Sequence, residues 1–168
     1  EVQGRSSSRE KRIMQGEDTE VAKKAKGYAL RLLKLRPRSR GELSSKMAAK
    51  GYDKVLISGI LDTLTQMGFI DDAAFAKAWL QYRLNRPVGF RRVERELIEK
   101  GIPKDVIRGH WAEVKESYDE LEVVRTLAKK RARQYNNIDP LKRKKRVMDY
   151  LSRRGFQLDI IMKVIKEI

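Results

Sequence analysis

The sequence contains no cysteine and a single histidine among its 168 residues. Without cysteine there is no disulfide bond and no thiolate metal site, and His110 alone cannot form a cluster with metal-ligand spacing. No apolar run approaches the roughly 18 residues that a membrane-spanning helix needs, and no segment has the layout of a signal peptide. We therefore expect a cytoplasmic protein that has no cofactor, no bound metal and no segment that spans a membrane.

Groups that carry catalysis are scarce as well. No glycine-rich loop precedes a helix in the manner of a phosphate-binding site. Asp71 and Asp72 are adjacent carboxylates, but they lie where a helix is expected to begin, and capping explains them. His110 lies beside Trp111 on an expected helix and is interpreted as a structural residue. The sequence therefore predicts a protein that is not an enzyme.

Acidic residues are too few to balance the basic ones. The formal net charge is +16, from 39 Lys and Arg against 23 Asp and Glu. Such an excess concerns binding partners rather than the fold. It indicates a polyanionic partner, which is a nucleic acid, an acidic protein surface or an anionic membrane.

One pattern occurs three times at a spacing of about 50 residues. In each copy two apolar residues lie eight and four positions before a glycine that follows a basic residue. The three copies are Leu43, Met47 and Gly51; Val93, Leu97 and Gly101; and Val147, Leu151 and Gly155. Each glycine is expected just after a short helix, in the left-handed position that ends it. A repeat of this length indicates a row of similar supersecondary units, which offers an extended surface rather than one deep pocket.

Helical periodicity fills the chain between these glycines, and neither strand alternation nor a hairpin signal occurs. The expected fold class is all-α, with three tandem three-helix repeats forming an elongated, curved array. The repeats are predicted at residues 19–69, 70–117 and 118–168. Residues 1–18 are rich in Ser, Arg, Glu and Gly without apolar periodicity, and they are expected to form a disordered tail.

The first helix of each repeat is expected to bury one apolar stripe. In repeat 1 this stripe runs from Val21 to Leu35. In repeat 2 Phe75, Trp79 and Tyr82 share a face, and the spacing of Phe75 and Trp79 indicates core residues rather than base-stacking residues.

Basic residues gather on the expected first and second helices of repeats 2 and 3. Arg91 and Arg95 project away from the apolar face formed by Val93 and Leu97. Residues 129–146 contain nine bases and one acid, and such a run repels itself unless an anion shares it. The residues predicted to form a basic binding face for a filament or a nucleic acid are Arg83, Arg86, Arg91, Arg92, Arg95, Lys129, Lys130, Arg133, Lys142, Lys145, Arg146 and Arg153.

The order of three short helices also suggests a helix-turn-helix, whose last helix reads bases in the major groove. The expected third helices, at residues 53–67, 103–115 and 158–167, are mostly apolar with mixed charge. This placement of the bases favours contact with phosphates or an acidic protein over the reading of sequence.

Several short motifs resemble the signature of the RecX family. They are Gly68-Phe69-Ile70-Asp71-Asp72 with Phe75, Ala76 and Trp79; Gly89, Arg91 and Glu96-Leu97; Lys100-Gly101-Ile102; and, in the first repeat, Ser39, Glu42-Leu43 and Lys50-Gly51-Tyr52. The resemblance covers roughly residues 20 to 168. It is most specific between Gly68 and Ile102, and it is weakest in repeat 3.

The resemblance implies a small all-α bacterial regulator of DNA recombination and repair. Proteins of this family bind the RecA recombinase, especially its filament on single-stranded DNA, and inhibit its ATPase and strand-exchange activities. Some members also bind DNA, so single-stranded DNA is a second expected partner of a monomeric protein. The alternative left open by the residues is a basic nucleic-acid-binding protein that is not sequence-specific and has no recombinase partner.

Overall fold

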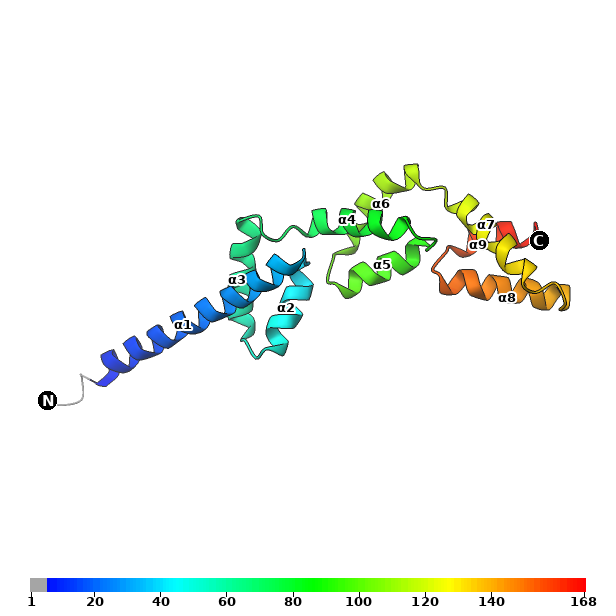
Figure 1. Ribbon diagram of the computed structural model, residues 1–168. Coiled ribbons are helices and arrows are strands. Elements are labelled where there is room, and N and C mark those ends of the chain that lie inside the picture. Colours follow the sequence, from blue (N-terminus) through cyan, green and yellow to red (C-terminus); the bar gives the residue numbers. More distant parts are fainter. Residues whose placement is uncertain (1–5) are drawn as a thin grey trace. The chain divides into compact units, whose positions relative to one another are not determined.

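The computed structural model describes the backbone of residues 6–168 and the side chains of residues 19–168. Over these residues the secondary structure is helical, with no strand (Figure 1). The helices of repeat 1 are α1 (Ser6–Leu35), α2 (Arg40–Ala49) and α3 (Lys54–Gln66). Repeat 2 contains α4 (Asp72–Leu84), α5 (Phe90–Glu99) and α6 (Lys104–Val114), followed by the 3-10 turn η1 (Lys115–Ser117). Repeat 3 contains α7 (Glu120–Arg133), α8 (Pro140–Arg153) and α9 (Leu158–Ile165). The predicted all-α fold of three-helix repeats is therefore confirmed for the described part of the chain.

Helix α1 begins at Ser6, so helical backbone covers part of the segment that was expected to be a tail. No proline precedes Pro37, and hence no residue in this stretch removes a helical hydrogen bond or forces the helix to end. Residues 1–5 of the expected tail lie outside the described residues.

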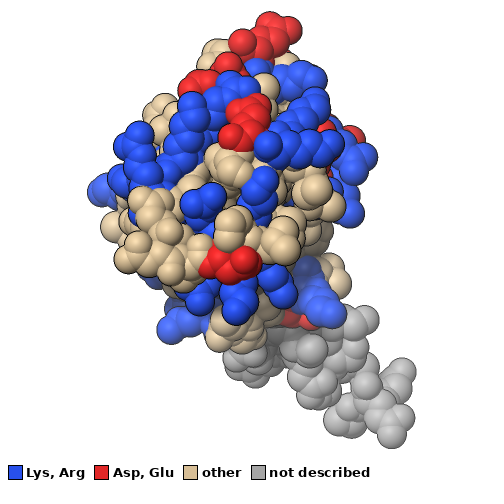
Figure 2. Space-filling model, turned by 90° about the vertical axis from the view of Figure 1, so that its right-hand side faces the viewer, with Lys and Arg blue, Asp and Glu red and all other residues tan. Residues whose placement is uncertain are grey.

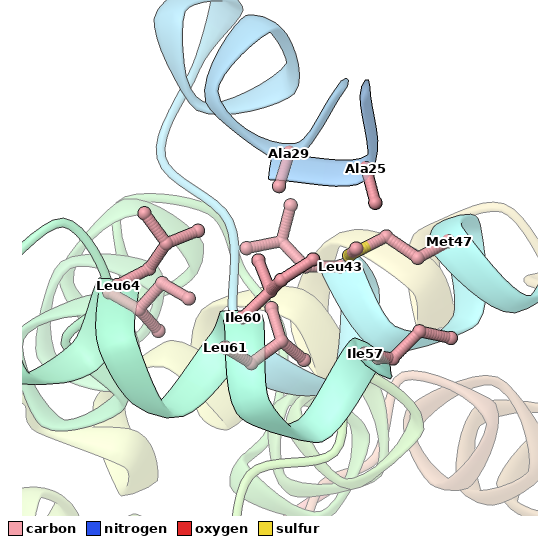
Figure 3. Close-up of a cluster of buried hydrophobic side chains, with 9 residues drawn as sticks. Ala25, Ala29, Leu43, Met47, Ile57, Ile60, Leu61 and Leu64 are labelled. Carbon is pink, nitrogen blue, oxygen red and sulfur yellow. The ribbon is translucent and has the colours of Figure 1, made fainter. Parts of the chain in front are cut away.

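Each repeat has a hydrophobic cluster of its own. In repeat 1 the alanines Ala25 and Ala29 of α1 face Leu43 and Met47 of α2, and Leu61 of α3 closes the cluster (Figure 3). The other two clusters contain Phe75, Ala76, Leu80, Val88, Phe90, Val93, Leu97, Ile102 and Ile107 in repeat 2, and Val124, Ala128, Val147, Leu151, Phe156, Ile161, Val164 and Ile165 in repeat 3. The chain forms two compact units, one ending at Asp72 and the other beginning at Ala73, so repeats 2 and 3 share a unit.

The second helix of every repeat ends at the predicted glycine. The φ angles of Gly51, Gly101 and Gly155 are 91°, 79° and 84°, values that L side chains rarely adopt. The apolar residue after each glycine donates its N–H to a carbonyl of the last helical turn: Tyr52 to Met47, Ile102 to Leu97, and Phe156 to Leu151. This is the Schellman arrangement, and it turns the chain back towards the core.

Three side chains on the expected apolar faces are exposed: Val21, Leu35 and Tyr82 are 44%, 77% and 51% exposed. Val21 and Leu35 lie on α1, which has 30 residues, whereas its partners α2 and α3 have 10 and 13. The apolar stripe of α1 therefore continues beyond the helices that could cover it. Tyr82 lies near the end of α4, where its hydroxyl accepts a hydrogen bond of 3.0 Å from Arg86.

We expect Gly155→Ala to destabilise the protein more than Gly51→Ala. Both glycines have positive φ angles, so alanine costs about 1–2 kcal/mol at either position. A Cβ at residue 155 would also lie 2.4 Å from the Cβ and 2.5 Å from the backbone nitrogen of Arg92, whereas nothing lies within 4 Å of a Cβ at residue 51. Urea unfolding followed by circular dichroism measures both losses. Equal losses would contradict a close approach of Gly155 to α5.

Candidate functional site

Every predicted binding residue except Arg83 is exposed. The exposed ones are Arg86, Arg91, Arg92 and Arg95 in repeat 2 and Lys129, Lys130, Arg133, Lys142, Lys145, Arg146 and Arg153 in repeat 3. Figure 2 shows a side of the molecule on which many Lys and Arg side chains are visible, interspersed with uncharged residues and with several Asp and Glu.

The arginines of α5 form one group. Arg91 and Arg95 are exposed, while Val93 and Leu97 on the same helix are completely buried. This is the amphipathic division that the helical periodicity predicts. Arg92 lies between them and donates to Glu96 one helical turn later, at 3.3 Å.

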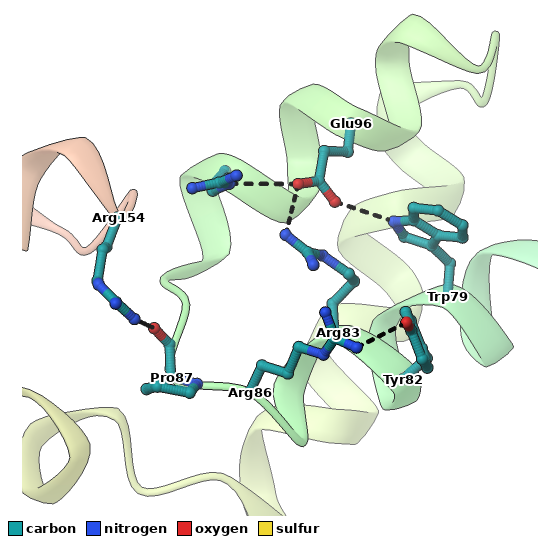
Figure 4. A network of polar contacts seen from close by, with 8 residues as sticks. Trp79, Tyr82, Arg83, Arg86, Pro87, Glu96 and Arg154 are labelled. Atoms are coloured by element: carbon teal, nitrogen blue, oxygen red, sulfur yellow. Dashed lines mark hydrogen bonds and ion pairs between the residues drawn. The ribbon is translucent and has the colours of Figure 1, made fainter.

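Arg83 belongs to a partly buried polar network instead of the exposed face (Figure 4). Its side chain is 12% exposed, and its Nη2 donates to Oε1 of Glu96 at 2.6 Å. The other oxygen of Glu96 accepts from the indole nitrogen of Trp79 at 3.2 Å. Arg83 and Trp79 of α4 thus both donate to the carboxylate of Glu96 on α5, so Arg83 joins two helices of repeat 2.

The α8–α9 turn of repeat 3 covers the start of α5. The N–H of Gly89 donates to the carbonyl of Arg154 at 2.9 Å, and the N–H of Arg91 donates to the carbonyl of Gly155 at 3.1 Å. A Cβ at Gly89 would lie 2.2 Å from the nitrogen of Phe156, so only glycine allows this approach. Free amides at a helix start attract anions, but here protein carbonyls occupy them.

A buried carboxylate completes this junction. Glu120 is 9% exposed and accepts a hydrogen bond from the N–H of Phe90. Burial raises the pKa of Glu120, the bond from Phe90 opposes this rise, and the nearby charge of Asp159 adds to it. The hydroxyl of Tyr118 donates to the carbonyl of Val88 at 3.0 Å, and burial together with the charge of Glu120 raises the pKa of Tyr118 to about 12.

Arginines and tyrosines alternate in repeat 3. The Cζ atom of Arg131 lies 5.1 Å from the ring centre of Tyr135 and 4.9 Å from that of Tyr150. Arg146 lies 5.2 Å from the ring of Tyr135, and Arg154 lies 4.8 Å from the ring of Tyr150. The order is therefore Arg146, Tyr135, Arg131, Tyr150, Arg154, and we call these five residues the Arg–Tyr stack. Each contact lies within the range of a cation–π interaction.

Only Arg146 of this stack was among the predicted site residues. The sequence does contain a signal for the others, because Arg131 and Tyr135 are four residues apart, and so are Arg146, Tyr150 and Arg154. Residues at this spacing are neighbours on a helix surface. The signal was missed because the basic run was interpreted through its charge alone.

The remaining predicted bases of repeat 3 lie on α7 and α8. Within the described residues, the side chains of Lys130, Arg133, Lys142 and Arg153 form no hydrogen bond or ion pair. In the described structure no side-chain hydrogen bond or ion pair joins the bases of α7 and α8 to Arg91. The main-chain N–H of Arg91 instead donates to Gly155 in the α8–α9 turn.

The described residues contain neither a candidate metal site nor a candidate membrane span. Among the residues that the structure describes, no group of His, Cys, Asp and Glu could hold a metal ion. None of the described helices has the length and apolar character needed to cross a membrane.

Comparison with known proteins gives a consistent result. The family models for the first, second and third three-helix domains of RecX match residues 25–64, 71–109 and 118–165. The chain is 40% identical over 142 residues to the regulatory protein RecX of Chlorobium limicola, covering 84% of this chain and 87% of that one. It is 33% identical over 145 residues to the regulatory protein RecX of Mycobacterium sp. strain JLS, covering 84% and 79%.

Two solved structures share the fold. A crystal structure of regulatory protein RecX superposes with a TM-score of 0.82 and 24% identity, covering 95% of this chain and 78% of that one. The crystal structure of RecX from Lactobacillus salivarius superposes with a TM-score of 0.77, again with 24% identity, covering 89% and 97%.

We expect Arg83→Ala to lower the free energy of unfolding by about 1–3 kcal/mol, because it leaves the partly buried Glu96 without its closest donor. Arg91→Ala is the matched control, since it removes an exposed arginine from the same repeat. It should change stability by less than about 0.5 kcal/mol. Urea titration of both variants tests this, and equal losses would show that Arg83 has no structural role.

We expect Glu120→Gln to gain stability relative to the parent protein as the pH rises. The pKa of Glu120 is raised in the fold, so its contribution to stability is fully present below the ordinary glutamate pKa of about 4.3 and is lost as the carboxyl ionises at higher pH. The difference in unfolding free energy between the two proteins should therefore grow from pH 4 to pH 7 in favour of the variant. A constant difference across this range would contradict the raised pKa.

Proposed function

Because the chain belongs to the RecX family, we propose that it is a negative regulator of the RecA recombinase. In this proposal it binds the RecA filament on single-stranded DNA and inhibits the ATPase and strand-exchange activities of the filament. The observation that carries the proposal is that the three RecX domain models match the three repeats in order. Relatives that are 31–40% identical are regulatory proteins of this family.

The surface of the described residues supports binding to an anionic partner. Two exposed basic groups lie in repeats 2 and 3, one on α5 and the other on α7 and α8. DNA within a filament presents a row of phosphates, and neutralising them with Lys and Arg supplies affinity without reading sequence. The proposed contact residues are therefore the exposed bases. Arg83 has a structural role instead, because it links α4 to α5 through its hydrogen bond to Glu96.

The third helices are unsuited to reading bases in a groove. Helix α3 buries Ile57, Ile60, Leu61 and Leu64, and α9 buries Ile161, Val164 and Ile165. The exposed faces of these helices carry apolar residues such as Val55 on α3 and Leu158 and Met162 on α9, where a groove-reading helix needs polar side chains that reach base edges. We thus propose a regulator that works without an enzyme activity or cofactor of its own, as a monomer in the cytoplasm.

The alternative is a basic nucleic-acid-binding protein without a recombinase partner. The exposed bases and the Arg–Tyr stack are compatible with this function as well. The two functions differ in the target: the alternative needs only DNA, whereas the regulator needs RecA.

The direct experiment is an ATPase assay of RecA on single-stranded DNA, titrated with the full chain. We expect ATP hydrolysis to fall as the protein approaches the RecA concentration, and strand exchange to fall with it. The protein without RecA should hydrolyse no ATP. If a saturating amount leaves both RecA activities unchanged, the proposed function is wrong.

We expect the double variant Arg91→Glu, Arg95→Glu to bind the filament roughly tenfold more weakly, because it reverses two exposed charges of the proposed face. The variant Lys104→Glu, Lys115→Glu is the control, since it reverses two exposed charges elsewhere in repeat 2. Binding is measured by the anisotropy of a labelled oligonucleotide coated with RecA, and helix content by circular dichroism. If both variants bind the filament equally weakly, binding depends on net charge and not on the position of the arginines. If the first variant loses helix content, Arg91 and Arg95 are needed for folding.

A further inference from the structure

We infer that the Arg–Tyr stack of repeat 3 is itself a binding site for single-stranded nucleic acid. The edges of its guanidinium groups bind phosphates, and the flat face at the exposed Arg146 end holds an unpaired base. The inference gives the expected contact with single-stranded DNA a specific place in the fold, and this site needs no RecA.

The stack fixes the directions of three guanidinium groups. Arg131 lies between the rings of Tyr135 and Tyr150, with its Cζ atom 5.1 Å and 4.9 Å from their centres. Arg146 and Arg154 lie against the same two rings, at 5.2 Å and 4.8 Å. Long flexible side chains normally lose conformational freedom when they bind a ligand, and that loss weakens binding. Here much of the ordering is already present in the unbound protein.

Most hydrogen-bond donors of the three arginines have no partner in the protein. Arg131 donates from Nη1 to Gln134 at 2.6 Å, and Arg154 donates from Nη1 to the carbonyl of Pro87 at 2.9 Å. The side chain of Arg146 makes no hydrogen bond or ion pair with any described residue. It lies over the ring of Tyr135 in a cation–π contact. A guanidinium group carries five N–H donors, so unused donors remain on each of the three. The Nε of Arg131 is buried, which leaves the Nη donors of that residue for a ligand.

In the described structure no carboxylate forms an ion pair with the arginines of the stack. By contrast, Arg125 in the same repeat pairs with both Glu122 and Glu167. Like charges that are held together repel, and an incoming anion relieves that repulsion. The exposed Lys142 lies one helical turn before Arg146 on α8 and extends the basic row.

The alternation of cations and rings favours a nucleic acid over an acidic protein. An acidic protein surface needs only positive charge, which lysine supplies equally well. A single strand offers phosphates, which match the planar guanidinium fork, and unpaired bases, which stack on guanidinium planes and aromatic rings. Sites for single strands combine these two features. Paired bases of a duplex are already stacked, so a duplex gains only the phosphate contacts.

The stack continues into the basic group of repeat 2. Its last member, Arg154, accepts the N–H of Gly89 through its main-chain carbonyl, and the next residue, Gly155, accepts the N–H of Arg91. A strand that leaves the stack at Arg154 therefore meets the start of α5, where Arg91 and Arg92 are exposed. The α8–α9 turn thus joins the two basic groups into one track.

The test measures the affinity of the full chain for bare DNA. A labelled single-stranded oligonucleotide and a duplex of the same length are titrated at several salt concentrations, and binding is followed by anisotropy. The variant Arg131→Lys, Arg146→Lys, Arg154→Lys keeps the charge but removes the planar groups. We expect it to lose roughly tenfold in affinity for the single strand and little for the duplex, while the slope of log K against log salt stays the same.

The corresponding triple alanine variant should reduce that slope by about 2, because three phosphate contacts contribute about 0.7 each on single strands. The variant Lys163→Ala, Lys166→Ala is the control, since it removes exposed charges from α9 and its flank, outside the stack. It should leave single-strand affinity within about twofold.

Two ring variants keep the test decisive if the arginine variants fold poorly. Tyr135→Phe, Tyr150→Phe retains both rings and should bind as the parent protein does, whereas Tyr135→Leu, Tyr150→Leu should lose single-strand affinity. Circular dichroism and cooperative unfolding verify that each variant is folded.

The inference is overturned if the lysine variant binds single strands as well as the parent protein, because charge alone would then explain binding. It is also overturned if the stack variants bind bare DNA normally but no longer bind the RecA filament. The stack would then contact an acidic surface of the RecA protein. If the parent protein fails to inhibit RecA but shows the expected DNA binding, the proposed function is wrong and the site stands.

Discussion

The left-handed glycine after the second helix is the constraint on which each repeat depends. Three short helices can share a small core only if the chain reverses tightly between the second and the third. Gly155 does this with a φ of 84°, and the N–H of Phe156 returns to the carbonyl of Leu151. The side chain of Phe156 then enters the core at 2% exposure. Because the same turn packs against Gly89, it also fixes repeat 3 against repeat 2, so one local conformation serves both the core and the junction.

The sequence predicted these turns because they are local. A glycine four residues after a buried apolar residue favours the end of a helix through local backbone conformation. Burial was less predictable, because periodicity identifies the apolar face of a helix but does not show how far its partners extend. This is why Val21 and Leu35 were wrongly placed in the core. The position of Arg83 depends on Glu96, which lies on another helix, and a count of charges along the chain contains no information about that pair.

The Arg–Tyr stack is predictable from the sequence only in part: less so than the turns, and more so than the position of Arg83. Its spacings along α7 and α8 are visible in the sequence, but the alternation arises only when Arg131 of α7 inserts between Tyr135 and Tyr150. That step requires the packing of two helices joined by a turn, which periodicity does not determine. The hydrogen bond from Arg154 to Pro87 was still less accessible, since it joins residues that are 67 positions apart. In this chain the sequence thus predicts helices and their ends well, and contacts between helices poorly.

The backbone itself offers little to an anion at two helix starts that lie among basic residues. At α2 the N–H of Arg40 donates to the carboxylate of Asp72 at 2.8 Å. At α5 the amides of Gly89 and Arg91 donate to carbonyls of the α8–α9 turn. Helix starts that would otherwise attract phosphate are therefore occupied by the protein. Binding of an anionic partner then depends on side chains, whose usual weakness is the conformational freedom that they lose. Stacking the guanidinium groups on tyrosine rings reduces that loss before the partner arrives, which is why the arrangement of the arginines matters in addition to their number.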